Sequence, residues 1–288
     1  TNHIVNPLMF AIESYGKFKS VDKILNKIEN TLISEENVET TEIKDFNNKI
    51  SLNDVSFKYD DKKVLENINF DFEKGKKYAL VGLSGSGKST LMKLISKRIK
   101  ADEGKICIDG TDLDEISRNS IINLISTINQ NVFLFKGSIY DNITLFSKDY
   151  SEEKVKDVIL KAELGKYLDR LYDKELISEN ANNLSGGEKQ RISIARSLIK
   201  DTKIILADEI LSSLDNEIAF SIEKELLELE NITLISVTHR LIKENLKQYD
   251  KILVLKDGKI EEKGNFEELM SFDSYFKKLY TISEVENN

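Results

Sequence analysis

The residues with the clearest chemistry form a glycine-rich segment, Gly82-Leu83-Ser84-Gly85-Ser86-Gly87-Lys88-Ser89-Thr90. An apolar run that predicts a buried strand, residues 78–81, precedes it, and residues 91–95 have the apolar spacing of a helix. Glycines let the backbone N–H groups turn inward, and the helix N-terminus adds partial positive charge. In such a loop Lys88 can reach the β and γ phosphates, and Ser89 can offer its hydroxyl to Mg²⁺. The segment therefore predicts a nucleoside triphosphate site.

Two acidic residues, Asp208 and Glu209, follow a second apolar run at residues 204–207. Acids at the carboxyl end of a parallel strand emerge into the ligand crevice. We expect Asp208 to hold Mg²⁺ and Glu209 to orient or deprotonate the water that attacks the γ phosphate. Taken alone, the same residues are equally consistent with a strand end and a solvated turn. The phosphate segment upstream is what favours the catalytic interpretation.

A second glycine-containing string reads Leu184-Ser185-Gly186-Gly187-Glu188-Lys189-Gln190-Arg191. Ser185 followed three residues later by Glu188 is a capping box, which predicts that a helix begins here. The N–H groups of Gly186 and Gly187 in its first turn would form another anion site. A well-capped helix without a ligand is the alternative interpretation.

The elements that must position these residues predict an α/β fold. Residues 50–57 and 68–72 alternate between apolar and polar, as expected for an antiparallel pair with one wet face. Beyond the phosphate segment, strand and helix patterns alternate, which predicts a mostly parallel sheet covered by helices. Residues 203–207 and 232–237 are continuous apolar runs, typical of strands buried on both faces. Residues 149–200 carry charged helical periodicity, so we expect a helical insertion there.

Composition narrows the class of protein further. The 288 residues are 40% hydrophobic and 32% charged, which suits a globular domain with a sizeable core. A net charge of −8 gives no reason to expect a nucleic-acid partner. The single cysteine, Cys107, excludes an internal disulfide and lies in a short strand pattern, which predicts a buried structural thiol. No apolar run is long enough to span a bilayer, and the start at Thr1 suggests a piece of a longer protein.

The string from Leu184 to Arg191 resembles the signature motif of the ATP-binding cassette (ABC) ATPases, and the other motifs of that family occur in order. Tyr59 matches the aromatic residue that stacks on adenine, and Gln130 matches the glutamine whose amide touches Mg²⁺. Ser213-Leu214-Asp215 matches the loop that crosses the dimer interface. His239 matches the switch histidine that contacts the γ phosphate. The resemblance covers about residues 49–265.

This resemblance implies a P-loop NTPase core with a mostly parallel sheet, an antiparallel β subdomain at the start and an inserted α-helical subdomain at about residues 131–200. Residues 132–143 are similar to the exporter segment whose apolar side chains receive the coupling helices of a membrane domain. The alternative is that Phe133 and Phe135 fill the core of the helical subdomain. Residues 1–48 are similar to the tail of a membrane-domain helix and its linker, which leaves residues 49–288 as the ATPase domain.

The mechanism that the resemblance implies is an exporter motor. Two ABC ATPase domains, from identical or different chains, would close head to tail over two ATP molecules with Mg²⁺. Each ATP would be held by the phosphate loop of one domain and by Ser185 and Gly187 of the other. A transmembrane domain outside this sequence would attach the motor to the cytoplasmic face of the plasma membrane.

Three departures from the family pattern stand out. Residues 177–183 lack the Glu-rich, Gly-containing segment of exporters, Asn129 replaces a common proline, and Ile210-Leu211 replaces a small residue and threonine. None of them removes a phosphate, metal or water ligand. A soluble ABC-type ATPase acting on a non-transport partner, or a nucleotide-binding interaction module without turnover, are the alternative functions. A chromosome-maintenance ATPase is disfavoured, because only a small subdomain's length of chain separates Lys88 from Ser185.

Overall fold

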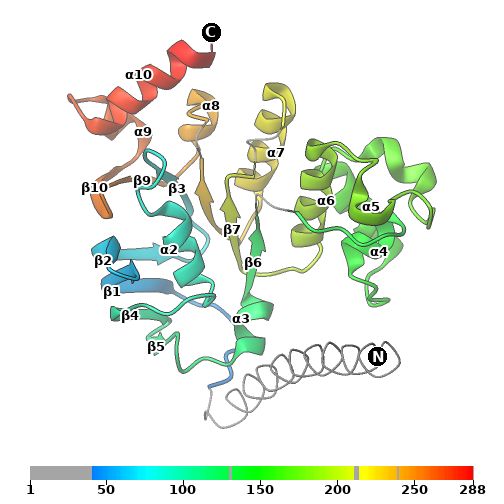
Figure 1. Ribbon diagram of the computed structural model, residues 1–288, viewed down its shortest axis with the longest axis horizontal. Helices are drawn as coiled ribbons and strands as arrows, with labels where there is room; N and C mark the ends of the chain where they lie inside the picture. The colour runs from blue at the N-terminus through cyan, green and yellow to red at the C-terminus, as the bar shows by residue number, and fades with distance from the viewer. Residues whose placement is uncertain (1–40, 130–131, 211–213, 239, 288) are drawn as a thin grey trace, which may run out of the picture. The chain divides into compact units, whose positions relative to one another are not determined.

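Two β-sheets form the framework of this protein (Figure 1). The computed structural model describes residues 41–129, 132–210, 214–238 and 240–287. Residues from Glu42 onward form one compact unit, and that unit contains both sheets. The predicted tail and linker at residues 1–48 lie almost wholly outside the described residues.

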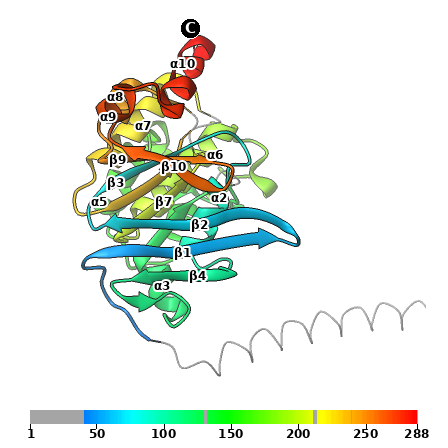
Figure 2. The same cartoon turned by 90° about the vertical axis from the view of Figure 1, so that its left-hand side faces the viewer.

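The first sheet is antiparallel, with the strand order β2-β1-β4-β5. Its strands are β1 (Lys49–Tyr59), β2 (Lys62–Glu73), β4 (Glu103–Ile108) and β5 (Thr111–Asp112). Ile50 of β1 lies opposite Phe72 of β2, and burial alternates along β2. The predicted antiparallel pair with one wet face is therefore confirmed. In Figure 2, β1, β2 and β4 lie side by side in one layer.

The second sheet has the order β10-β9-β3-β8-β7-β6. Its strands are β3 (Lys77–Val81), β6 (Ile125–Ile128), β7 (Ile204–Asp208), β8 (Thr233–Val237), β9 (Lys251–Lys256) and β10 (Lys259–Gly264). All neighbouring pairs are parallel except β9 with β10. Ile204 and Leu206 of β7 face one apolar cluster, while Ile205 and Ala207 face the other. Burial on both faces is what the continuous apolar runs predicted.

Helices cover the parallel sheet on both faces. They are α2 (Lys88–Ile95), α3 (Arg118–Leu124), α4 (Ile139–Thr144), α5 (Glu152–Lys161), α6 (Gly186–Leu198), α7 (Asn216–Glu228), α8 (Lys243–Leu246), α9 (Phe266–Met270) and α10 (Tyr275–Asn287). The apolar side of α2 joins the cluster shared with the antiparallel sheet. The apolar sides of α4 to α7 join the cluster on the opposite face. The fold class expected from the sequence is therefore confirmed.

The chain between β6 and β7 is the helical part. Helices α4, α5 and α6 gather together in Figure 1, with two short 3₁₀ turns between them, η1 (Gly165–Arg170) and η2 (Glu179–Ala181). Apart from one bridge between Gly137 and Ile177, no strand pairing occurs among its described residues. Less of this part is regular helix than its charge pattern predicted, because turns occupy much of the chain between α5 and α6.

Cys107 corrects one sequence prediction. Its neighbours in β4, Ile106 and Ile108, are buried, but Cys107 is only half-buried. Successive side chains of a strand point to opposite faces, so Cys107 lies on the outer side of β4. Partial burial still raises the pKa of its thiol, which keeps the thiolate scarce at neutral pH.

Candidate functional site

The glycine-rich segment connects the end of β3 to the start of α2, as expected. Gly87 is the N-cap of α2, with φ of 104°. A Cβ atom there would lie 2.5 Å from Leu65 Cδ2 and 2.9 Å from the Val64 carbonyl oxygen. A Cβ atom on Gly82 would lie 2.2 Å from the Leu255 carbonyl oxygen. Both positions therefore require glycine for space as well as for backbone conformation.

Lys88 is turned back onto this loop. It is only 4% exposed, and its Nζ donates to the carbonyl oxygens of Gly82 at 2.8 Å and Leu83 at 3.0 Å. Burial lowers the pKa of Lys88, and the nearby carboxylates of Glu209 and Asp208 partly offset that effect. A buried cation in a loop of backbone donors is suited to bind an anion.

The loop has donors and space to offer a phosphate. Helix α2 has no side-chain cap at its N-terminus, so its first-turn N–H groups are not satisfied in that way. The buried Oγ of Ser86 has no hydrogen-bond partner among the described residues. A Cβ atom added to Gly85 would meet no atom within 4 Å, so the loop is open at this point. Thr90, at the end of the segment, is buried in α2. These features fit the phosphates of a nucleotide.

Ser89 connects the phosphate loop to Asp208, the last residue of β7. Its Oγ donates to Asp208 Oδ1 at 3.1 Å. Burial raises the pKa of Asp208, while the hydrogen bond from Ser89 acts in the opposite direction. A hydroxyl and a carboxylate at this distance are oxygen ligands of the kind that Mg²⁺ takes from proteins. Glu209 follows directly, half-buried and with a positive φ of 51°.

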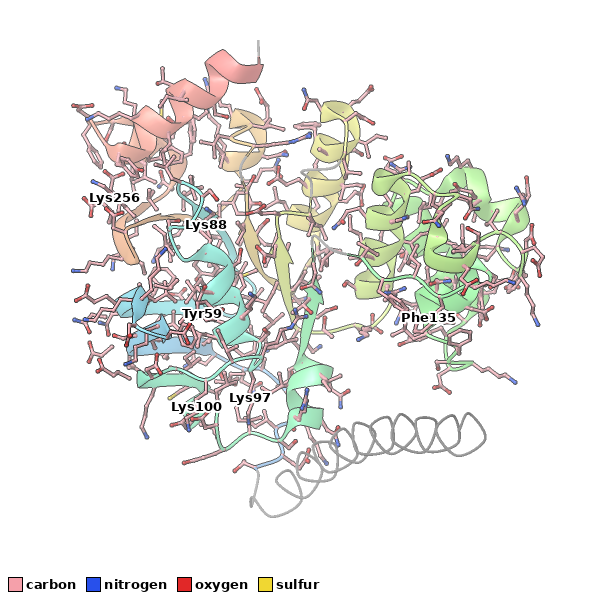
Figure 3. All side chains as sticks on the ribbon, viewed as in Figure 1. Tyr59, Lys88, Lys97, Lys100, Phe135 and Lys256 are labelled. Atoms are coloured by element: carbon pink, nitrogen blue, oxygen red, sulfur yellow. The ribbon has the colours of Figure 1, made fainter. Side chains whose placement is uncertain are left out.

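Among the remaining predicted site residues, Tyr59 lies within the described part of the chain. Tyr59, labelled in Figure 3, is the last residue of β1 and is 43% exposed. Its ring meets that of Phe57 edge-on, with 4.8 Å between the ring centres. An exposed aromatic ring has a face free to stack on a base. Gln130 and His239 lie outside the described residues, as does Ser213 of the predicted interface loop.

Ser185, Gly186 and Gly187 begin helix α6, and Ser185 is its N-cap. The predicted capping box is confirmed: Ser185 Oγ accepts from the Glu188 N–H at 3.2 Å, and Glu188 Oε2 accepts from the Ser185 N–H at 2.8 Å. Burial opposes ionisation of Glu188, yet hydrogen bonds from Lys166, Tyr167 and Ser185 lower its pKa to about 2. Helices α6 and α2 pack on opposite faces of the parallel sheet. The structure thus brings Lys88, Ser89 and Asp208 together and leaves the α6 residues apart from them.

The structure also reveals a junction beside Gln130. Arg98, just beyond α2, donates from Nη1 to Asn129 Oδ1 at 2.9 Å. Gln190 of α6 is buried and donates from Nε2 to the Asn129 carbonyl oxygen at 3.1 Å. From the sequence, Asn129 was only a departure from the family pattern, and no local signal indicated Arg98 as its partner. Asn129 therefore links the end of the phosphate-loop helix to α6.

Arg240, which follows the predicted switch histidine in the sequence, forms a similar link to the predicted interface loop. Asp215 caps α7 by accepting from the Ile218 N–H at 3.0 Å. Arg240 donates to the Leu214 carbonyl oxygen at 2.5 Å and to Asn216 Oδ1 at 3.0 Å. The chain after β8 is thereby attached to the start of α7.

Phe133 and Phe135 are exposed rather than buried, at 67% and 40% (Figure 3 labels Phe135). Their rings meet edge-on at 5.0 Å, and Phe146 extends the exposed cluster at 5.5 Å from Phe135. Arg196 of α6 holds the backbone beneath them, since its Nη1 donates to the Phe133 carbonyl oxygen at 3.0 Å. The alternative that Phe133 and Phe135 fill the subdomain core is therefore wrong.

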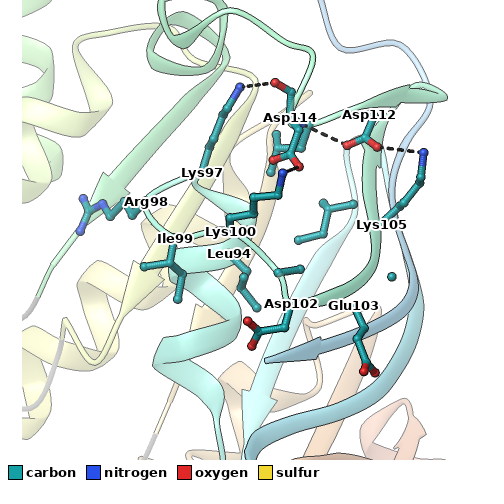
Figure 4. Close-up of a pocket in the computed structure, with 14 residues that line it drawn as sticks. Leu94, Lys97, Arg98, Ile99, Lys100, Asp102, Glu103, Lys105, Asp112 and Asp114 are labelled. Atoms are coloured by element: carbon teal, nitrogen blue, oxygen red, sulfur yellow. Dashed lines mark hydrogen bonds and ion pairs between the residues drawn. The ribbon is translucent and has the colours of Figure 1, made fainter. Parts of the chain in front are cut away.

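A separate hollow of about 560 Å³ lies between the end of α2 and the β4–β5 hairpin (Figure 4). Two pairs of charged side chains in its lining form ion pairs: Lys100 with Asp114 at 2.8 Å and Lys105 with Asp112 at 3.3 Å. Lys97 donates to backbone carbonyl oxygens, and Arg98 donates to Asn129 and Thr127. None of the predicted site residues lines it. Its cations are thus engaged locally, and we assign no role to the hollow.

Comparison with known proteins finds matches over the residues that form the candidate site. The family model described as ABC transporter matches residues 65–212. That range runs from β2 through the phosphate loop and α6 to just beyond Glu209. The chain belongs to the ABC transporter family. Within the described residues, no helix combines the length and apolar character needed to cross a membrane.

Individual relatives are similar over most of this chain. The ATP-dependent lipid A-core flippase of Neisseria meningitidis serogroup B is 40% identical over 236 residues, covering 81% of this chain and 38% of the flippase. That of Desulfotalea psychrophila is 35% identical over 289 residues, covering 94% of this chain and 50% of the flippase. The solved structure of a bacterial Atm1-family ABC exporter with ATP bound aligns with a TM-score of 0.78 and 29% identity, covering 90% of this chain and 47% of the exporter. The chain spans half or less of the length of these relatives.

Proposed function

We propose that this chain is the ATP-hydrolysing motor domain of an ABC exporter. The observation that carries the proposal is the junction where Ser89 donates to Asp208 beside the buried, inward-turned Lys88. Further support comes from membership of the ABC transporter family and from relatives named as ATP-dependent flippases.

In the proposed site, the triphosphate lies in the loop of residues 82–90. Lys88 exchanges its two carbonyl acceptors for phosphate oxygens, and the unpaired Ser86 hydroxyl and the N–H groups of α2 supply neutral donors. The exposed ring of Tyr59 stacks on the adenine. Catalysis by such a loop rests on positioning and on stabilisation of phosphate charge.

Hydrolysis also needs a metal and a water. Ser89, Asp208 and Gln130 are the proposed ligands of Mg²⁺, which would supply charge neutralisation at the phosphates. Glu209 is the proposed base that orients or deprotonates the attacking water, and His239 is proposed to contact the γ phosphate. Burial raises the pKa of Asp208 and so disfavours its ionised form. A cation bound beside the carboxylate would favour the ionised form again.

The proposed partner is a second ABC ATPase domain. Ser185, Gly186 and Gly187 pack with α6 on the face of the sheet opposite to α2, and both Ser185 and Gly186 are exposed. Separation from the phosphate loop of the same chain favours contact with a nucleotide bound to another domain. Asp215 is the N-cap of α7, and we propose that it belongs to the loop that crosses the interface of such a dimer.

A transmembrane domain is the second proposed partner, and it would hold residues 49–288 at the cytoplasmic face of the plasma membrane. The exposed cluster of Phe133, Phe135 and Phe146 supports this proposal, because aromatic side chains gathered on a surface are typical of a contact with another protein. Residues 1–48 are proposed as the connection, and residues 131–200 as the helical subdomain that bears the cluster.

Turnover of Mg-ATP tests the proposal. The wild-type chain should bind and hydrolyse ATP, and Glu209→Gln should retain binding while kcat falls about a hundredfold or more, as for loss of a general base. Glu217→Gln, an exposed acid on α7, is the matched control and should leave kcat unchanged. Binding without turnover by the wild type would instead favour an interaction module, and absence of both would refute the nucleotide site.

A further inference from the structure

The carboxylate of Glu188 is unusually well supplied with donors. Its side chain is only 13% exposed. Oε2 accepts from the N–H and the Oγ of Ser185, at 2.8 and 2.9 Å. Oε1 accepts from Lys166 Nζ at 2.5 Å and from the Tyr167 hydroxyl. A capping box needs only the contacts to Ser185, so the donors on Oε1 are additional.

These contacts determine where the proton of the Ser185 hydroxyl points. Ser185 Oγ accepts from the Glu188 N–H at 3.2 Å, and its single proton is donated to Glu188 Oε2. A hydroxyl has only one proton to give. If Ser185 is to donate to a phosphate oxygen, the phosphate must compete with Glu188 for that proton.

Lys166 and Tyr167 reach this carboxylate from a different element. Both belong to η1, which is anchored because Leu164 is fully buried and Tyr167 packs against the same apolar cluster as Ile192 of α6. The Lys166 ammonium also lies 4.9 Å from the centre of the Tyr167 ring. The η1 turn therefore places a cation and a hydroxyl on the far oxygen of Glu188.

We propose that Lys166 and Tyr167 are positioning residues that act through Glu188 to make the Ser185 hydroxyl available to the γ phosphate of ATP on a second ABC ATPase domain. The inference rests on the proposed function. Two donors on Oε1 draw charge away from Oε2 and make it a weaker competitor for the proton.

Removing the cation should therefore slow turnover. In the full 288-residue chain, Lys166→Met leaves Glu188 with an uncompensated charge. We expect kcat to fall about three- to tenfold, which corresponds to part of the free energy of one charge-assisted hydrogen bond. KM for ATP should stay unchanged, because the contacts of Tyr59 and Lys88 are untouched. Lys161→Met removes only an exposed pair with Asp157 on α5 and is the matched control.

Two further variants separate positioning from general structural support. In a Ser185→Ala background, where no hydroxyl proton remains to be released, Lys166→Met should cause no additional loss. Glu188→Gln introduced together with Lys166→Met should restore part of the lost kcat, because the uncompensated charge is gone. A single cooperative unfolding transition in urea for each variant would establish that all of them are folded.

The outcomes distinguish this inference from the function on which it rests. If the wild type turns over ATP and Ser185→Ala slows it, the paired-site function stands. An equal loss from Lys166→Met with and without the Ser185 hydroxyl, or a further loss on adding Glu188→Gln, would then overturn only the inference. Absence of turnover in the wild type would overturn both.

Discussion

At the scale of single residues, Glu188 shows how charge and burial combine at the start of α6. Its pKa of about 2 lies below the ordinary value of 4.5 because hydrogen bonds from Lys166, Tyr167 and Ser185 outweigh the burial that would raise it. A carboxyl whose pKa is lowered by folding stabilises the protein above its unfolded pKa. That contribution disappears as the pH falls through the folded pKa.

Glu188→Gln should therefore lower the free energy of unfolding most above about pH 4.5, and the difference from wild type should shrink between pH 4.5 and 2. Urea denaturation at a series of pH values measures this difference. Glu225→Gln, at a half-buried acid on α7, serves as a control for a carboxyl outside such a cluster. A difference between Glu188→Gln and wild type that stays constant with pH would contradict the ionised, hydrogen-bonded carboxylate.

At the scale of elements, the strand–loop–helix unit from β3 to α2 depends on Gly87. Gly87→Ala would force an L side chain into φ of 104° and bring its Cβ within 2.5 Å of Leu65. We expect a loss of about 1–3 kcal/mol in stability and a weaker affinity for ATP, because the loop must shift. Gly75→Ala has a similar positive φ but open space around its Cβ, so it should cost about 1 kcal/mol and leave ATP affinity unchanged. Equal ATP affinity in both variants, measured by calorimetry, would contradict this role of Gly87.

Elements and local motifs were the parts that the sequence predicted best. The strands around the phosphate loop and the capping box at Ser185 depend on neighbours within a few residues, and the structure confirms both. The partners of Glu188 and Asn129 were not predicted, because Tyr167 and Arg98 reach them only after distant segments have packed. The burial of Cys107 was predicted wrongly, since a short strand pattern does not tell which face is covered.

At the scale of the whole molecule, the site is divided between two faces of one sheet. Lys88, Ser89 and Asp208 meet where α2 begins and β7 ends, while Ser185 begins α6 on the opposite face. Asn129 connects the two parts through Arg98 and Gln190. This division supports the proposal that a second such domain completes the ATP site.

The measurement that tests this account most directly is the mass in solution of Glu209→Gln with Mg-ATP and with Mg-ADP. Blocking hydrolysis should trap a dimer that ATP holds together through Ser185 and Gly187 and that ADP does not. A monomer with both nucleotides, when ATP binding has been confirmed, would contradict the pairing of two identical chains, which is one of the two arrangements that the proposed dimer allows.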